Sequence, residues 1–326
     1  MSEYLLEVKG LKTYFNHMNT QVPAVDGVDF AIRKGETLGI VGESGCGKSI
    51  TAMSILQLLP PEASIVDGQV LFKGNNLADF TEKQMTKIRG NEISMIFQEP
   101  MTSLNPAYTV GYQIGEAIRT HRKLDKKQAR SIAIDMLKLV GIPAPEKRVD
   151  QYPHELSGGM RQRVMIAMAL SCNPELLIAD EPTTALDVTV QAQILEVMKE
   201  LKEKFNTSIM MITHDLGVVA EMADYVIVMY AGTVVEYSDV RSLYKKPLHP
   251  YTEGLMNALP KIDDPQDELP AIQGTVPSLY DMPKGCPFQP RCPYAQEVCK
   301  QEKPDLFAVD DRKVRCFLYS DRMGGQ

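Results

Sequence analysis

Short apolar runs alternate with stretches of helical spacing along most of the chain. The runs that predict strands are residues 37–41, 93–97, 176–179, 209–213 and 225–230, which are rich in Ile, Val and Met. A helix is predicted at 49–59, directly after the first of them. Strands that alternate with helices indicate βαβ units around a largely parallel sheet. Near the start, residues 4–8 and 28–32 predict two antiparallel strands joined by a loop.

Two regions depart from this pattern. Residues 110–121 and 126–140 have helical apolar spacing, and Gly141 and Pro143 end the second run. The span of about 101–165 has no convincing strand, so we expect a helical subdomain inserted into the α/β body. From residue 246 onward prolines recur, and they exclude long helices and central strands. We therefore expect one large domain at 1–245 and an extension at 246–326.

The charge and composition of the chain argue against several classes of protein. Lys and Arg total 35 against 42 Asp and Glu, a formal charge of −7, which argues against binding nucleic acid through its phosphates. No stretch approaches 18 uncharged apolar residues, and the opening MSEYLLEVKG lacks the apolar core of a secretory signal. We expect a cytoplasmic protein.

The first strand of the α/β pattern leads into Gly42-Glu43-Ser44-Gly45-Cys46-Gly47-Lys48-Ser49, a G-x-x-x-x-G-K-S phosphate loop. Its glycines allow successive backbone N–H groups to face an anion at a helix N-terminus. Lys48 is expected to reach the β- and γ-phosphates of a nucleotide, and Ser49 to bind Mg²⁺. Cys46 lies at the same helix N-terminus, where the dipole is expected to lower its pKa.

A second apolar strand, at 176–179, ends in two carboxylates. Asp180 suits Mg²⁺ binding, direct or through water, and Glu181 suits polarising an attacking water molecule. After a phosphate loop, a strand ending in Asp-Glu is the expected partner.

The segment Leu156-Ser157-Gly158-Gly159-Met160-Arg161-Gln162-Arg163 decides the class. Ser157 can cap a helix that starts near Gly158, and the two glycines let a phosphate approach exposed N–H groups. This segment resembles the signature sequence of ATP-binding-cassette (ABC) ATPases. The resemblance covers roughly residues 4–245 and implies a P-loop NTPase cassette: a RecA-like parallel sheet core, an antiparallel β subdomain and a helical subdomain.

The resemblance also implies roles for further residues. Gln98 matches the Q-loop, Asp187 in Ala185-Leu186-Asp187 the D-loop, and His214 the switch histidine that contacts the γ-phosphate. Phe15 falls where the family places the aromatic side chain that stacks on adenine, with Tyr14 as the alternative. Glu181, His214 and Gln98 are then the catalytic residues, and Ser49, Gln98 and Asp180 the Mg²⁺ ligands. The nucleotide-binding residues are Phe15, Gly42, Ser44, Gly45, Cys46, Gly47, Lys48, Ser49, Thr51, Gln98, Ser157, Gly158, Gly159, Asp180 and Asp187.

In this family the signature sequence completes the site of a second subunit, so two ATP molecules are sandwiched between two cassettes. One chain here holds one cassette. It is therefore expected to pair with a second ABC ATPase subunit, identical or related.

The extension resembles the C-terminal region of oligopeptide and dipeptide importer ATPases, through Leu248-His249-Pro250-Tyr251-Thr252 and Gly274-Thr275-Val276-Pro277-Ser278. His249 is interpreted as a residue that begins a helix rather than as a ligand.

Four of the six cysteines fall in this extension: Cys286, Cys292, Cys299 and Cys316. Their spacing lacks zinc knuckles, and proline follows the first two, as in some iron–sulfur runs. We expect a [4Fe–4S] cluster, with Zn²⁺ and then no metal as alternatives. Such a metal would supply much of the folding energy of the extension.

These features together predict an ATP-hydrolysing subunit, dependent on Mg²⁺, that energises import of dipeptides or oligopeptides. Its partners would be the second ATPase subunit, two membrane permease subunits and, indirectly, an extracytoplasmic peptide-binding protein, and it would lie at the cytoplasmic face of the membrane. The alternative is a soluble ABC ATPase acting in DNA repair or translation. The chain lacks the long coiled coils and the paired cassettes of those relatives, and an exporter ATPase fits the extension poorly.

Overall fold

The computed structural model describes residues 3–17, 20–98, 103–184, 187–259 and 272–320. The chain forms two compact units. The first unit contains Met1–Leu6, Ile32–Thr37 and Phe72–Thr213, and the second contains Glu7–Ala31, Leu38–Leu71 and His214–Gln326. Each unit is therefore built from segments far apart in sequence.

The second unit holds two sets of strands. In one, β1 (Leu6–His17) lies between β2 (Thr20–Ile32) and β4 (Ala63–Phe72). In the other, β3 (Thr37–Val41) pairs in parallel with β9 (Tyr225–Tyr230), and β9 pairs antiparallel with β10 (Thr233–Asp239). All five residues of β3 are buried, as expected of a strand covered on both faces.

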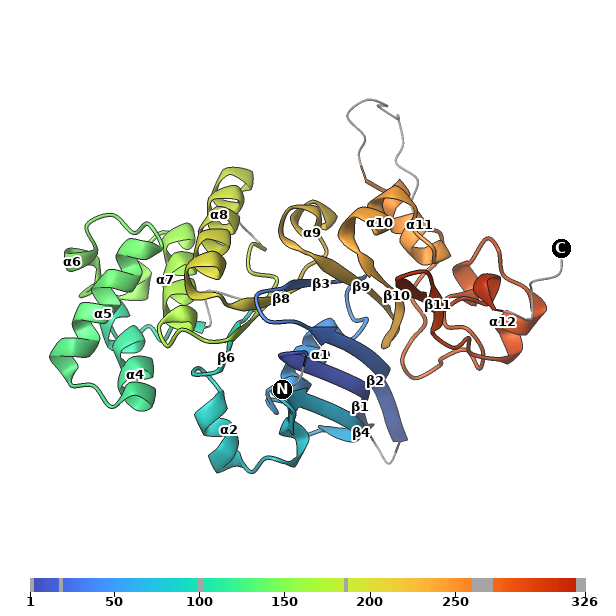
Figure 1. Cartoon of the computed structure of the whole chain (residues 1–326), viewed down its shortest axis with the longest axis horizontal. Coiled ribbons are helices and arrows are strands. Elements are labelled where there is room, and N and C mark those ends of the chain that lie inside the picture. Colours follow the sequence, from blue (N-terminus) through green and yellow to red (C-terminus); the bar gives the residue numbers. More distant parts are fainter. Residues whose placement is uncertain (1–2, 18–19, 99–102, 185–186, 260–271, 321–326) are drawn as a thin grey trace. The chain divides into compact units, whose positions relative to one another are not determined.

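The C-terminal segment continues this second sheet. Strand β10 pairs with β12 (Arg312–Val314), which pairs with β11 (Phe307–Val309) (Figure 1). The helices of this unit are α1 (Lys48–Ile55), α9 (Leu216–Met222), α10 (Val240–Lys245), α11 (Pro250–Asn257) and α12 (Glu297–Gln301). Short 3-10 turns lie at Gln289–Arg291 and Phe317–Tyr319.

An aromatic cluster attaches the segment as well. The ring of Phe288 packs against Tyr230 at the end of β9 and against Tyr251 of α11, with centroids 5.2 and 5.4 Å apart. All three side chains are buried. Strand pairing and apolar burial therefore hold the extension, and the expectation that a metal supplies its folding energy is wrong.

The first unit has a parallel sheet of three strands: β6 (Ile93–Ile96), β7 (Leu176–Asp180) and β8 (Ser208–Ile212). Its helices are α2 (Glu82–Ile88), α4 (Val110–Arg122), α5 (Lys126–Leu139), α6 (Pro145–Arg148), α7 (Gly158–Leu170) and α8 (Val188–Phe205). Strand β5 (Asn75–Asn76) and the 3-10 turns Leu77–Asp79 and Pro153–Glu155 complete it.

Helices α4, α5, α6 and α7 gather into one group within this unit (Figure 1). Side-chain caps mark the starts of α4 and α5: Thr109 accepts from the N–H of Tyr112, and Asp125 and Gln128 form a capping box at α5. Among the described residues between 103 and 165 there is no strand, as the helical spacing predicted.

No helix in the described ranges is both long and apolar enough to cross a bilayer.

Candidate functional site

The phosphate loop connects β3 to α1 in the second unit. Gly42, Gly45 and Gly47 have φ angles of 151°, 77° and 98°, a region that side chains rarely adopt. A Cβ at Gly42 would lie 2.2 Å from the carbonyl oxygen of Met229, and one at Gly47 would lie 2.5 Å from that of Ala24. At Gly45, by contrast, nothing lies within 4 Å of such an atom. The loop therefore packs closely at two of its glycines and is open at the third, which leaves room for an anion.

Lys48 is folded back onto this loop. Its ammonium donates to the carbonyl oxygens of Gly42 (2.8 Å) and Glu43 (3.0 Å), and the side chain is buried. A phosphate oxygen would offer the same ammonium a charged and stronger acceptor. Ser49 is half-buried in the first turn of α1, Ser44 is exposed, and the hydroxyl of Thr51 donates to the carbonyl of Gly47 (2.9 Å). The Lys48 ammonium is thus held against the backbone of the phosphate loop itself.

Cys46 behaves differently from the expectation drawn from the sequence. Its side chain is only 1% exposed, and burial raises the pKa of the thiol. Nearby Lys48 favours the thiolate but does not outweigh this loss of hydration. The prediction of a lowered pKa at this helix N-terminus is therefore wrong.

The two candidate aromatic residues lie on opposite faces of β1, because successive side chains in a strand alternate. Thr13 is buried, and its hydroxyl lies 2.8 Å from that of Ser54 in α1, so its face of the strand is turned toward the phosphate-loop helix. Phe15 shares that face. Tyr14 lies on the other, where its hydroxyl donates to Asp26 (3.1 Å). Phe15 therefore lies on the face of β1 that is turned toward α1, and Tyr14 lies on the opposite face.

In the first unit, two side chains hold the carboxylate of Glu181. Its Oε2 accepts from the Nε2 amide of Gln98 (3.0 Å) and from the hydroxyl of Thr184 (2.9 Å). The backbone of Glu181 has a φ of 47°, which is unusual outside glycine and is typical of strained functional positions. Asp180 is buried at the end of β7. The structure thus brings Gln98 and Glu181 together.

Thr184 was not among the residues predicted from the sequence. The only available signal was a hydroxyl side chain three residues after the carboxylate, and that pattern is too common to be specific.

The signature segment begins helix α7 as predicted. Ser157 is the N-cap, and its hydroxyl accepts from the N–H of Met160 (3.4 Å). Ser157 and Gly158 are exposed, whereas a Cβ at Gly159 would lie 2.9 Å from Val190 of α8. The side-chain amide of Gln162 donates to the carbonyl of Pro182, so α7 is tied to the segment that follows Glu181.

The remaining predicted residues lie at element ends. Asp187 caps α8, and its carboxylate accepts from the N–H of Val190 (3.0 Å). His214 follows the last residue of β8 by two positions and is exposed. Ala185 and Leu186 of the D-loop motif, and Glu99 and Pro100 after Gln98, lie outside the described residues.

The residues expected to bind Mg²⁺ have suitable chemistry. Ser49 offers a hydroxyl, Gln98 an amide and Asp180 a carboxylate, which are the hard oxygen donors that Mg²⁺ prefers. The donor set therefore fits a magnesium ion delivered with a nucleotide.

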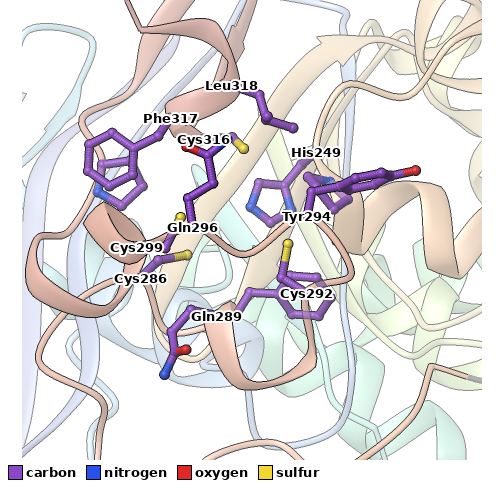
Figure 2. Close-up of a pocket in the computed structure, with 13 residues that line it drawn as sticks. His249, Cys286, Gln289, Cys292, Tyr294, Gln296, Cys299, Cys316, Phe317 and Leu318 are labelled. Atoms are coloured by element: carbon purple, nitrogen blue, oxygen red, sulfur yellow. The ribbon is translucent and has the colours of Figure 1, made fainter. Parts of the chain in front are cut away.

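The four cysteines of the extension surround one cavity of about 20 Å³ (Figure 2). Burial raises the pKa of Cys286 to about 11 and that of Cys316 to about 12, and it raises the pKa of Cys292 as well. Thiols with such pKa values are protonated at neutral pH, whereas metals bind thiolates.

The expectation of a [4Fe–4S] cluster at Cys286, Cys292, Cys299 and Cys316, or of Zn²⁺ in its place, is wrong. Among the residues that the structure describes, no group of three or more His, Cys, Asp or Glu is arranged to hold a metal ion. A cavity of about 20 Å³ accommodates roughly one water molecule, far less than a four-iron cluster needs.

His249 is buried beside the cysteine cavity and has a structural role, as its interpretation from the sequence proposed. It is the N-cap of α11, and its Nδ1 accepts from the N–H of Tyr251 (3.0 Å). Burial lowers the pKa of His249 to about 3, so the ring stays neutral and can accept this bond.

Comparison with known families matches two regions. Residues 25–184 match the family described as ABC transporter, and residues 235–299 match the oligopeptide/dipeptide transporter C-terminal region. Two different parts of the chain therefore point to the same class of protein.

Similar proteins extend over nearly the whole chain. The oligopeptide transport ATP-binding protein AppD of Bacillus subtilis is 58% identical over 97% of this chain and 97% of its own. The dipeptide transport ATP-binding protein DppD of the same organism is 52% identical over 98% and 96%, and DppD of Escherichia coli is 49% identical over 98% of both chains.

Solved structures show the same fold. A dimeric ATP-binding cassette in a post-hydrolysis state, bound to ADP and Pi, is 28% identical, covers 72% of this chain and 99% of its own, and has a TM-score of 0.65. The protein cbiO1 of Clostridium perfringens, part of an ABC transporter complex, is 28% identical over 75% and 92%, with the same score. The fold is that of an ABC cassette, and this chain belongs to the ATP-hydrolysing subunits of ABC transporters, in the group that carries the oligopeptide/dipeptide transporter C-terminal region.

Proposed function

We propose that this ATPase energises the import of dipeptides or oligopeptides through separate membrane subunits. Two features of the chain carry the proposal. One is the phosphate loop, with its glycines in the required backbone conformation and the Lys48 ammonium against it. The other is the carboxylate of Glu181 after β7, which accepts hydrogen bonds from Gln98 and Thr184. The names of the relatives, which are peptide transport ATP-binding proteins, support the choice of substrate.

Binding of ATP would involve the second unit. The N–H groups of residues 44–49 would receive the phosphates at the open side of Gly45, and Lys48 would exchange the carbonyls of Gly42 and Glu43 for β- and γ-phosphate oxygens. Phe15 would stack on adenine, since its face of β1 is turned toward α1. Ser44, Cys46 and Thr51 belong to the same loop and helix.

Hydrolysis requires a base for the attacking water. Glu181 would accept a proton from water while the water oxygen bonds to the γ-phosphorus and the bond from that phosphorus to the β-γ bridging oxygen breaks, which releases ADP and phosphate. Gln98 and Thr184 fix the carboxylate in one orientation for this step. His214 would contact the γ-phosphate.

Ser49, Gln98 and Asp180 would hold the Mg²⁺ ion that accompanies ATP. When bound, such an ion would neutralise negative charge that develops on the phosphate oxygens.

The second half of each site would come from a second ATPase subunit, identical or related. Ser157, Gly158 and Gly159 would contact the nucleotide held by the partner's phosphate loop, and Asp187 would lie near the junction. The exposure of Ser157 and Gly158 supports this arrangement, and the similar solved cassette is dimeric.

Further partners would be two permease subunits at the cytoplasmic face of the membrane, fed by an extracytoplasmic peptide-binding protein. Residues 1–245 would form the nucleotide-binding domain, with its helical subdomain at about 101–165, and residues 246–326 the extension. A role in DNA repair or translation is not favoured, because the relatives named above are peptide transport proteins.

The test is the variant Glu181→Gln. It should retain ATP binding and lose hydrolysis by about 10²–10⁴-fold, because the phosphate loop is intact while the base is lost. Glu196→Gln, on the exposed side of α8 in the same unit, is the matched control and should hydrolyse ATP at the parental rate.

Uptake of a labelled dipeptide by cells should fail with Glu181→Gln and persist with Glu196→Gln. Uptake that persists in Glu181→Gln cells, when no other ATPase can replace it, would contradict the proposed transport role.

A further inference from the structure

Glu43, the second residue of the phosphate loop, forms hydrogen bonds with two side chains of the C-terminal segment. Its backbone N–H donates to the hydroxyl of Tyr251 (2.9 Å). Its carboxylate accepts two bonds from the guanidinium of Arg291, from Nη1 to Oε2 (2.7 Å) and from Nη2 to Oε1 (3.1 Å). The carbonyl of the same residue accepts from Lys48. Three groups of one loop residue are thus occupied, two of them by side chains more than 200 positions away in sequence.

Arg291 is itself firmly held. Its side chain is 4% exposed, and it also donates to the carbonyls of Gln273 (3.0 Å) and Ile272 (3.3 Å) and to the hydroxyl of Tyr230 (3.4 Å). A forked pair between guanidinium and carboxylate fixes direction as well as distance. Because water has little access to Arg291, its pairing with Glu43 is stronger than an exposed ion pair would be.

We propose that Arg291 and Tyr251 are positioning residues of the ATPase: they hold Glu43 and thereby keep the phosphate loop in its nucleotide-binding conformation. This proposal rests on the proposed function, since it concerns the same nucleotide site. The extension, which contributes none of the nucleotide-binding motifs, is in this view a built-in support for the loop. Nucleotide affinity then depends on residues outside the cassette motifs.

The expected effect is on binding rather than on chemistry. If the supported loop conformation is only partly populated, the apparent dissociation constant rises in inverse proportion to that population. Once ATP is bound, its phosphates hold the loop themselves, so the turnover number should change little. Loss of the pair should therefore raise KM while kcat stays almost constant.

The experiment is a double-mutant cycle with Arg291→Gln, Glu43→Gln and both together. Each single variant should raise the Kd and KM for ATP by about five- to tenfold with kcat within about twofold, and the double variant should be no worse than either single one. Arg291→Lys should recover the parental KM only in part, since an ammonium cannot form the fork.

Glu43→Gln is the sharper variant because electrostatics alone predicts the opposite result. Removing a negative charge beside the triphosphate should tighten ATP binding by Coulomb attraction, whereas the positioning role predicts weaker binding. Glu43→Gln also leaves the contacts of Arg291 to Gln273, Ile272 and Tyr230 in place, so the extension should keep its fold. The proposal can therefore be tested with Glu43→Gln even if Arg291→Gln does not fold. Arg312→Gln is the matched control, because Arg312 also lies in the extension but donates to the carbonyl of Lys246, and it should leave KM unchanged.

Tighter or unchanged ATP binding by Glu43→Gln would overturn the proposal, and so would single effects that multiply in the double variant. Failure of the proposed function would be seen separately: the parental protein would not hydrolyse ATP, or Glu181→Gln would still do so. The outcome for Arg291 and Glu43 is thus independent of that for Glu181.

Discussion

The side-chain amide of Gln98 donates a 3.0 Å hydrogen bond to the carboxylate of Glu181 within the first unit. Gln98 follows β6 by two positions and Glu181 follows β7 directly, and these strands pair in parallel with Ile96 opposite Ala179. Because parallel strands end at the same edge of a sheet, their loops start side by side. A residue expected to bind Mg²⁺ is therefore in direct contact with the expected base.

Thr184 holds the same carboxylate oxygen and offers a test of orientation. Thr184→Val removes the hydroxyl at nearly constant volume, so the carboxylate of Glu181 loses this bond and keeps the one from Gln98. We expect kcat for ATP hydrolysis to fall by about tenfold with KM nearly unchanged, which corresponds to about one hydrogen bond to a charged group.

Thr184→Ser is the control for that substitution. It restores a hydroxyl and should recover most of the activity. Equal losses in the valine and serine variants would mean that packing, rather than the hydrogen bond, explains the effect.

Ser157 has two roles that can be separated. It caps α7 in its own chain, and we place it against the nucleotide of the partner. Ser157→Arg should abolish hydrolysis while the isolated monomer binds ATP with nearly parental Kd, measured by equilibrium titration. Loss of the cap should cost about 1 kcal/mol of stability in addition.

Ser157→Asn keeps a capping side chain and isolates the second role. It should restore stability without restoring full activity. An increase in the Kd of the Ser157→Arg monomer would contradict the two-subunit sandwich.

Periodicity predicted the buried strands well and the exposed ones poorly. Strands β3 and β9 match their predicted ranges because both are apolar along their length. Strands β1 and β2 are 12 and 13 residues long, far longer than predicted, since their exposed positions interrupt the apolar pattern. Strand β12, Arg312–Val314, carries no apolar alternation at all and exists because β10 presents an edge to it.

The candidate site, too, was predictable from the sequence only in part. The phosphate loop and the signature segment are local motifs, so sequence alone predicts their residues. Arg291 and Glu43 lie 248 positions apart, and nothing in the spacing of the chain indicates that they pair. The prediction of a metal site at the four cysteines is wrong for a related reason. Their clustering in sequence does not indicate how large the cavity is that they line or how far they are buried.

Cys46 should be unreactive despite its place in the phosphate loop. Burial raises the pKa of this thiol, so the thiolate fraction at pH 8 is smaller than for an ordinary cysteine and rises as pH increases. Iodoacetamide should label Cys46 in the folded protein at least about tenfold more slowly than in urea, as measured by peptide mass spectrometry. Equal rates in the two states would show that the thiol is exposed and ionised as readily as a free one.

The pH dependence of stability should depend on His249. This ring is buried, and its Nδ1 accepts from the N–H of Tyr251, so its pKa falls to about 3 in the folded protein against about 6.5 when unfolded. Between these values the unfolded chain binds the extra proton, so this contribution to stability is complete above pH 6.5 and declines as the pH falls toward 3. The loss should be on the order of 1 kcal/mol between pH 6.5 and 5.5.

His249→Asn keeps a capping side chain but does not titrate, so its stability should fall less over the same interval. Urea unfolding of both proteins at each pH measures the difference, in which the titration of all other groups cancels. Parallel stability curves would mean that His249 is protonated as easily in the folded protein as in the unfolded chain, and that its bond to Tyr251 does not restrict its charge.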